Sequence, residues 1–147
     1  MMDARDFLEV AWSLLEGNGE AEWRSAVSRA YYAAFHVARQ LLIQCGFAVP
    51  RADQAHAYLW LRLSNAGHPD VQHAGAQLGF LRQERNRADY DIQRPLDQTS
   101  AIDRVQMAAD VIELLDAAAK EATVLAPITE AMKIYERDVL REVTWHP

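Results

Sequence analysis

The sequence predicts an all-α fold: an antiparallel up-and-down bundle of four or five helices with an extra C-terminal helix. Three observations support this prediction. Apolar residues recur at intervals of three or four along most of the 147-residue chain, and no segment alternates with period two for long enough to form a strand. The connections between helical segments are short, which favours antiparallel neighbours. We expect one domain over residues 1–147, with its core at about residues 3–125.

Turn and cap residues delimit the first four predicted helices. The first helix is expected to end before Gly17. The second and longest ends at Gly46, since glycine favours the left-handed conformation that follows many helices. Asp53 is a candidate N-cap for the third helix. Pro69 suits the first turn of a helix and begins the fourth.

Two further helices are expected after the fourth. Ser100 and Asp103 have the spacing of a capping pair and are expected to begin the fifth helix. Pro127 is expected to separate a last helix at about residues 128–143. The apolar stripe expected to face the core from the fifth helix comprises Ile102, Val105, Ala109, Ile112 and Leu115.

Composition narrows the class of protein. Half of the residues are apolar and 24% are charged, which is typical of a globular chain, and no apolar run approaches the roughly 18 residues of a membrane span. The first residues lack the order of a signal peptide, and Cys45 is the single cysteine, so we expect a cytoplasmic protein without a disulfide. The net charge of −6 works against non-specific nucleic-acid binding. Any contact with RNA therefore needs a local basic region.

Asp53 and His56 are the one pair with a spacing that suggests a metal site. Two ligands without a third are a poor metal signature, so we interpret them as a capping aspartate and a surface histidine. No glycine-rich phosphate loop and no nucleophile elbow are present. We expect neither a metal ion nor a cofactor.

Charged residues occur on the apolar side of the fourth helix. At about 100° per residue, Arg82, Arg85 and Asp89 fall in or beside the arc of its apolar stripe. A guanidinium is rarely buried without a partner. We therefore expect this side to meet an anion, a carboxylate of another element or a water-filled groove. Arg85 and Asn86 are suited to binding a phosphate.

The second helix carries a polar stripe along its length. Arg29, Tyr32 and His36 lie close together in angle on this helix. One interpretation is an ordinary solvated face. The other interpretation sets these three residues across a groove from Arg85 and Asp89. Small residues such as Ala34 also allow a close approach by another helix, from the same chain or from a second copy.

Two segments carry a family resemblance. They are residues 22–36, Glu-Trp-Arg-Ser-Ala-Val-Ser-Arg-Ala-Tyr-Tyr-Ala-Ala-Phe-His, and residues 85–91, Arg-Asn-Arg-Ala-Asp-Tyr-Asp. Both resemble the small prokaryotic branch of the HEPN superfamily, which has an Arg-Ala-Tyr-Tyr-Ala helix and a later Arg-Asn-x-Ala-Asp-Tyr element. The resemblance spans roughly residues 3–120. It implies a helical bundle that is usually dimeric.

The resemblance also implies an activity and partners. Many members are metal-independent endoribonucleases that act as toxins or phage-defence effectors, through an arginine followed after four to six residues by a histidine. Small members are often encoded beside a minimal nucleotidyltransferase that acts as antitoxin, and related members carry a tyrosine that this partner adenylylates. On this basis we expect a homodimer, with a nucleotidyltransferase and RNA as candidate partners.

The nuclease motif is incomplete in this chain. Four residues separate Arg85 from Tyr90, which stands where the histidine is expected, and no histidine lies nearby in the sequence. Cleavage by 2′-hydroxyl attack needs a group that exchanges a proton near neutral pH, whereas tyrosine titrates at about 10. Neighbouring arginines that lower the pKa of Tyr90, or His36 acting as base, would supply one. The candidate catalytic residues are Arg85, Asn86, Asp89 and Tyr90, and the candidate binding residues are Arg29, Tyr32, His36 and Arg82.

Three functions remain open from the sequence. The first is a toxin that cleaves RNA and is held inactive by a nucleotidyltransferase antitoxin. The second is a non-catalytic HEPN module that binds nucleotide, RNA or a protein partner through the same residues. In the third, Arg85 and Asp89 form an i,i+4 pair that only supports packing. Under the first, Tyr90 is the expected acceptor of AMP, with Tyr32 as the alternative.

Overall fold

The computed structural model describes residues 2–147 and confirms the all-α bundle. Within that range the chain forms helices and no β-strand. None of these helices combines the length and the apolar composition that crossing a membrane requires. The elements are α1 (Arg5–Leu15), α2 (Glu20–Cys45), α3 (Gln54–Ser64), α4 (Pro69–Tyr90), α5 (Gln98–Ala119), α6 (Ala122–Tyr135) and the π-helix η1 (Glu136–Leu140).

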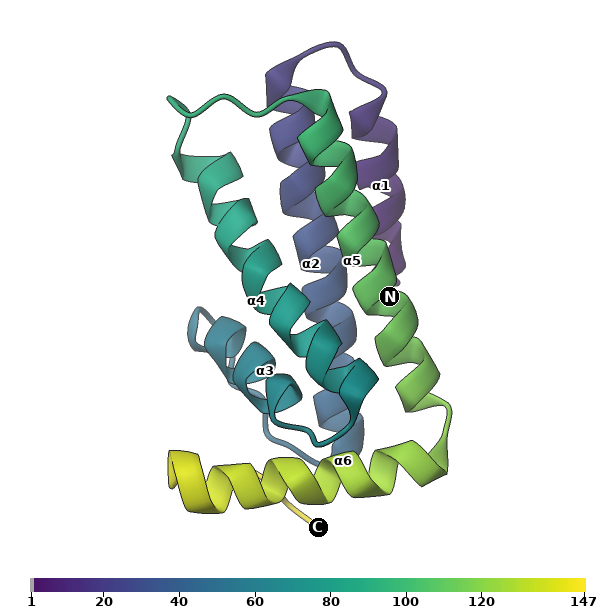
Figure 1. Ribbon diagram of the computed structural model, residues 1–147, viewed down its shortest axis with the longest axis vertical. Helices are drawn as coiled ribbons and strands as arrows, with labels where there is room; N and C mark the ends of the chain where they lie inside the picture. Colours follow the sequence, from purple (N-terminus) through teal and green to yellow (C-terminus); the bar gives the residue numbers. More distant parts are fainter. Residues whose placement is uncertain (1) are drawn as a thin grey trace.

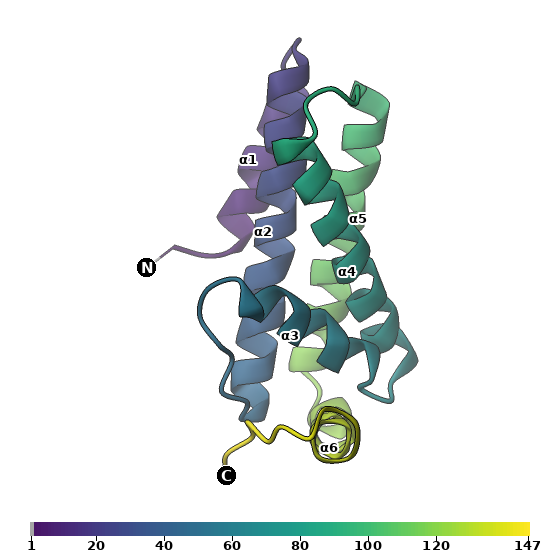
Figure 2. The same ribbon diagram turned by 90° about the vertical axis from the view of Figure 1, so that its left-hand side faces the viewer.

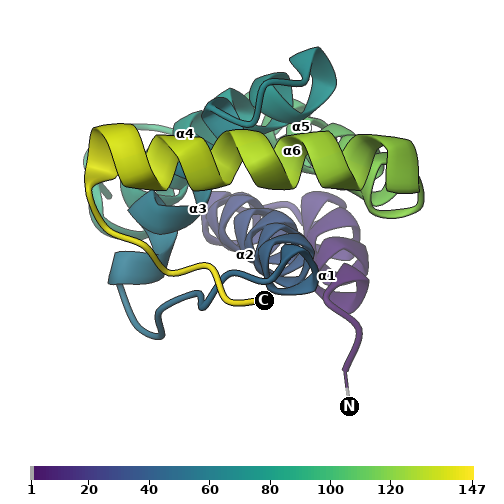
Figure 3. The ribbon, with the colours of Figure 1, turned by 90° about the horizontal axis from the view of Figure 1, so that it is seen from below.

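Four helices run along the long axis of the molecule with alternating direction. Figure 1 shows α1 and α4 running one way and α2 and α5 the other. The long helix α2 is central, because it packs against α1, α4 and α5. The shorter α3 packs mainly against α4, and α6 lies across one end of the bundle, as Figure 3 shows from below.

Helix α2 packs closely because its buried face is rich in alanine. Ala30, Ala33, Ala34 and Ala38 are each at most 1% exposed, so these small residues serve packing within the chain. The helix ends as expected at Gly46, which has φ +105°. A Cβ at Gly46 would lie 2.7 Å from Trp145 Nε1. Only glycine therefore suits both the backbone conformation and the approach of the C-terminal segment.

The start of α4 agrees with the sequence, and its contact with α3 depends on a glycine. Pro69 is in the first turn, and the His68 side chain accepts a hydrogen bond from the Asp70 backbone N–H at 3.2 Å. A Cβ at Gly75 would lie 2.5 Å from the backbone nitrogen of Ser64, so α3 and α4 meet there backbone to backbone.

Two cap predictions were wrong. Asp53 precedes α3, but its side chain makes no capping hydrogen bond. Asp97, not Ser100, is the N-cap of α5, because Asp97 Oδ1 accepts from the Ser100 backbone N–H at 2.7 Å. The helix begins almost one turn earlier than predicted. Its buried face includes Ala101 and Val105, and Ile102 is 42% exposed instead of facing the core.

The prediction for Pro127 was also wrong, since this proline lies inside α6 instead of before it. The helix already begins at Ala122, so Pro127 lies in its second turn, where it removes one backbone hydrogen bond and crowds the carbonyl of Thr123. Ile128 and Met132 are fully buried and attach α6 to the bundle. The helix also holds Lys133, whose Nζ lies 3.7 Å from the centre of the Trp145 ring.

Candidate functional site

Arg85 lies in the interior beside two tyrosine rings of α2. Only 8% of the residue is exposed, as the apolar position in the sequence predicted. Its guanidinium carbon is 5.6 Å from the centre of the Tyr31 ring and 5.1 Å from that of Tyr32. These distances suit attraction between a cation and an aromatic ring. The Nε atom of Arg85 is buried and has no hydrogen-bond partner within the described chain.

Asp89 joins this arginine to α2. A carboxylate oxygen of Asp89 lies 3.8 Å from Arg85 Nη1, and Ser28 Oγ donates a hydrogen bond to Asp89 at 3.1 Å. The expected i,i+4 pair is therefore present, and it is part of a link between α2 and α4. The Asp89 side chain is 30% exposed, so the link lies at the edge of the interior.

Tyr32 lies close to two guanidiniums, those of Arg29 and Arg85. The guanidinium carbon of Arg29 lies 5.2 Å from the centre of the Tyr32 ring and also 5.2 Å from that of Phe7. The structure thus places Arg29 and Arg85 on the same tyrosine ring. His36 instead packs against Phe7 and Phe35, with ring centres 5.9 Å and 5.1 Å away. Burial lowers the pKa of His36, and the charge of Arg39 acts in the same direction.

His56 was assigned to the surface, and the structure corrects this. Only 6% of His56 is exposed, and its Nδ1 shares a hydrogen bond of 2.6 Å with Tyr31 Oη. Figure 2 shows how α3 extends from α2 towards α4, which brings the start of α3 against α2. The signal was in the sequence, because His56 precedes Leu59 by three residues and Leu63 by seven. It therefore belongs to the buried stripe of α3.

Burial and positive charge act together on the His56–Tyr31 pair. Burial lowers the pKa of His56, and the nearby charges of Arg82 and Arg85 lower it further. Burial raises the pKa of Tyr31 well above its ordinary value, against the opposing effect of the same two arginines. Both groups are thus neutral near pH 7. We call the assembly of Ser28, Arg29, Tyr31, Tyr32, His56, Arg82, Arg85 and Asp89 the Arg85 cluster.

Two of the predicted catalytic residues lie outside this cluster. Tyr90 is the last residue of α4 and is 76% exposed. Around the helix axis its side chain is separated from that of Arg85 by about 140°. It therefore does not share the inward direction of Arg85. Asn86 is exposed and lines a pocket between α3 and α4 together with Arg82 and Trp60.

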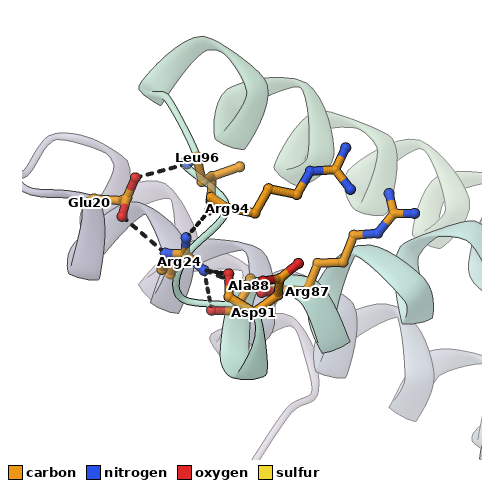
Figure 4. A network of polar contacts seen from close by, with 7 residues as sticks. All are labelled: Glu20, Arg24, Arg87, Ala88, Asp91, Arg94 and Leu96. Atoms are coloured by element: carbon orange, nitrogen blue, oxygen red, sulfur yellow. Dashed lines mark hydrogen bonds and ion pairs between the residues drawn. The ribbon is translucent and has the colours of Figure 1, made fainter.

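Arg24 is an interior arginine that the sequence analysis missed. It is 8% exposed, and its Nη1 donates to the backbone carbonyls of Arg87, Ala88 and Asp91 at 3.2, 3.0 and 3.2 Å. Its Nη2 donates to the carbonyl of Arg94. Figure 4 shows Arg24 beneath the end of α4, where carbonyls of the last turn lack partners in the helix. Arg24 therefore caps α4 from α2.

Glu20 completes this network from the previous turn of α2. Its Oε2 accepts from Arg24 Nε at 3.3 Å, and its Oε1 accepts from the Leu96 backbone N–H at 2.8 Å. The segment after α4 is thus held at both ends by α2. Arg24 precedes Val27 by three residues and Tyr31 by seven, so its inward direction was readable from the same periodicity.

The geometry suits anion and ring recognition better than proton transfer. Three guanidiniums, from Arg29, Arg82 and Arg85, accompany the single carboxylate of Asp89 in the Arg85 cluster. The nearest imidazole, that of His56, is buried and already hydrogen-bonded. A general base must reach the proton that it removes. An anionic ligand, in contrast, would be attracted by the excess of positive charge.

The helices that build the cluster lie inside a family match. The model of the HEPN domain matches residues 1–120, which leaves out α6 and the segment after it, as the resemblance predicted. Comparisons with curated proteins and with solved structures gave no match. The match covers most of the 147 residues, including both segments on which the resemblance was based. The chain belongs to the HEPN family.

Proposed function

We propose that this protein is a HEPN module that binds single-stranded RNA through the Arg85 cluster without cleaving it. The observation that carries the proposal is the partly exposed Tyr32 ring close to the guanidiniums of Arg29 and Arg85, whose carbons lie 5.2 and 5.1 Å from its centre. Single-stranded RNA is bound by aromatic rings, on which bases stack, together with arginines that attract phosphates. Arg29 and Tyr32 are partly exposed and would contact the RNA. Buried Arg85 would hold Tyr32 in place and add positive charge.

The local charge supports this assignment. The whole chain carries a net charge of −6, which disfavours contact with a polyanion over most of its surface. The three arginines of the cluster outnumber its nearby carboxylates, which are Asp89 and, beside His56, Asp53. This local positive charge would favour RNA here over the acidic parts of the surface.

The test is the affinity for a labelled single-stranded 12-mer RNA, measured by fluorescence anisotropy at low salt. Tyr32→Ala should weaken binding by about 10- to 100-fold, since stacking of one base contributes roughly 1–3 kcal/mol. Arg29→Gln should weaken it by about tenfold. Arg51→Gln, at an exposed arginine before α3, changes the net charge equally and is the control. Equal affinities of the Arg29 and Arg51 variants would contradict the proposal.

A second candidate is a toxin that cleaves RNA and is controlled by a nucleotidyltransferase antitoxin. The observation in its favour is that a hydroxyl and an imidazole, those of Tyr31 and His56, lie beside the arginines that would hold a phosphate. Cleavage would require His56 to become accessible. The same 12-mer, incubated in EDTA and analysed for fragments, separates the two functions. Cleavage that is lost in His56→Gln and Arg85→Lys would establish the second candidate.

A further inference from the structure

A pocket where α2, α4 and α5 meet is lined by four arginines and one carboxylate. They are Arg24, Arg87, Arg94 and Arg104, with Glu84. This arginine pocket differs from the Arg85 cluster, with which it shares none of these residues. Since the chain as a whole is acidic, so local an excess of positive charge marks a place for an anion.

The backbone around the pocket is fixed before any ligand binds. Arg24 donates to the carbonyls of Ala88 and Asp91, and also to that of Arg94. These bonds use its guanidinium for structure and hold the segment after α4 in place. The Arg94 side chain therefore extends from an ordered backbone, which reduces the entropy lost on binding.

Glu84 lies close to both Arg87 and Arg104, and it does not neutralise the pocket. Its Oε1 lies 3.2 Å from Arg104 Nη2 and 3.8 Å from Arg87 Nη1, and its side chain is 13% exposed. One carboxylate thus forms ion pairs with two guanidiniums. With Arg94 added, three positive charges face one negative charge, so the pocket keeps an excess of two.

The directions of Arg87 and Arg94 supply a second observation. Figure 4 shows their guanidiniums pointing the same way, away from the Arg24 network, and both residues line the arginine pocket. These two positive charges repel each other, and an anion bound between them would be attracted to both. The planar guanidinium donates two parallel hydrogen bonds, a geometry that matches phosphate oxygens.

We propose that the arginine pocket binds a phosphate group, with Arg87 and Arg94 as its direct donors and Arg104 as a supporting charge. The phosphate comes from one of two sources. The first is a small molecule, either a mononucleotide or free phosphate. The second is the backbone of an RNA, and this source alone rests on the proposed function. Glu84 positions Arg87 and Arg104, and Arg24 fixes the backbone beneath them.

Titration calorimetry with inorganic phosphate and with AMP tests the site in the absence of RNA. Arg94→Gln keeps the backbone carbonyl that Arg24 uses and removes only the guanidinium. It should weaken binding of either probe by about tenfold, the loss of one charge-assisted hydrogen bond. Arg51→Gln changes the net charge equally and should bind as the wild type does.

The single-stranded 12-mer RNA distinguishes the two sources of phosphate. If neither small probe binds but Arg94→Gln weakens the RNA and reduces the dependence of log affinity on log salt by about one, the ligand is an RNA phosphate. If no probe binds at millimolar concentration, or if the Arg94 and Arg51 variants behave alike with every probe, the phosphate site is overturned. The proposed function is tested separately, by the RNA affinities of the Arg29 and Tyr32 variants.

Discussion

Tyr31 Oη and His56 Nδ1 share a hydrogen bond of 2.6 Å in the interior, and their rings stack with centres 5.6 Å apart. This contact joins α2 to the start of α3 directly beside Arg85. It also makes the protein sensitive to acid. The folded chain keeps His56 neutral because burial and two arginines lower its pKa, whereas the unfolded chain protonates it at the ordinary value of 6.5.

Acidification should therefore destabilise the fold through His56. Below about pH 6.5 the unfolded state binds more protons than the folded state, so the free energy of unfolding decreases as pH falls. The thermal midpoint of the wild type should drop between about pH 7.5 and about pH 5.5. His56→Gln should be less stable at the higher pH but lose less on acidification. His73→Gln, at an exposed position of α4, is the control, and a His56→Gln profile parallel to the wild type would refute the assignment.

The buried ion pair between α3 and η1 should be costly to break. Arg62 Nε donates to Glu136 Oε2 at 2.8 Å, with side chains only 2% and 0% exposed. Arg62→Met leaves the Glu136 carboxylate buried without its cation and should cost about 3–5 kcal/mol in free energy of unfolding, measured with urea. Adding Glu136→Gln should recover part of this loss, because the amide is neutral. A single variant as stable as the wild type, or a double variant with no recovery, would argue against a buried charge pair.

The protein should be a homodimer. The prediction rests on the family, because the alanines of α2 are used for packing within the chain. Sedimentation equilibrium at micromolar concentration should give about twice the chain mass of 16.6 kDa. A single species of chain mass would remove the idea of a site shared between two copies.

Tyr90 is expected to accept AMP from a nucleotidyltransferase partner, if one is encoded beside this protein. Its 76% exposure makes it accessible to a modifying enzyme, whereas Tyr32 is only partly exposed. Intact-mass analysis after co-expression should show added AMP that is lost in Tyr90→Phe and kept in Tyr32→Phe. The reverse pattern would make Tyr32 the acceptor. An unmodified protein whose partner still neutralises it would indicate inhibition by binding alone.

The sequence by itself determined that the chain is a helical bundle and, at several positions, where a helix begins or ends and which side faces inward. Gly46 and Pro69 delimit helices through their own backbone preferences, and the inward direction of Arg85 follows from the spacing of its neighbours. These properties depend on residues within about one or two turns, so a single chain reveals them. The sequence prediction placed the starts of α5 and α6 too late. Near each start, several residues could equally well cap or interrupt a helix, so the sequence does not single out Asp97 as the N-cap of α5 or Ala122 as the first residue of α6.

Only the tertiary structure decided which interior polar groups meet. His56 lies 25 residues from Tyr31, and Arg62 lies 74 residues from Glu136. Arg24 reaches carbonyls at the far end of α4. Periodicity gives the direction of each side chain around its own helix, but it does not give the partner. The partner depends on how the helices pack, and that arrangement is set by the shapes of all their buried faces together.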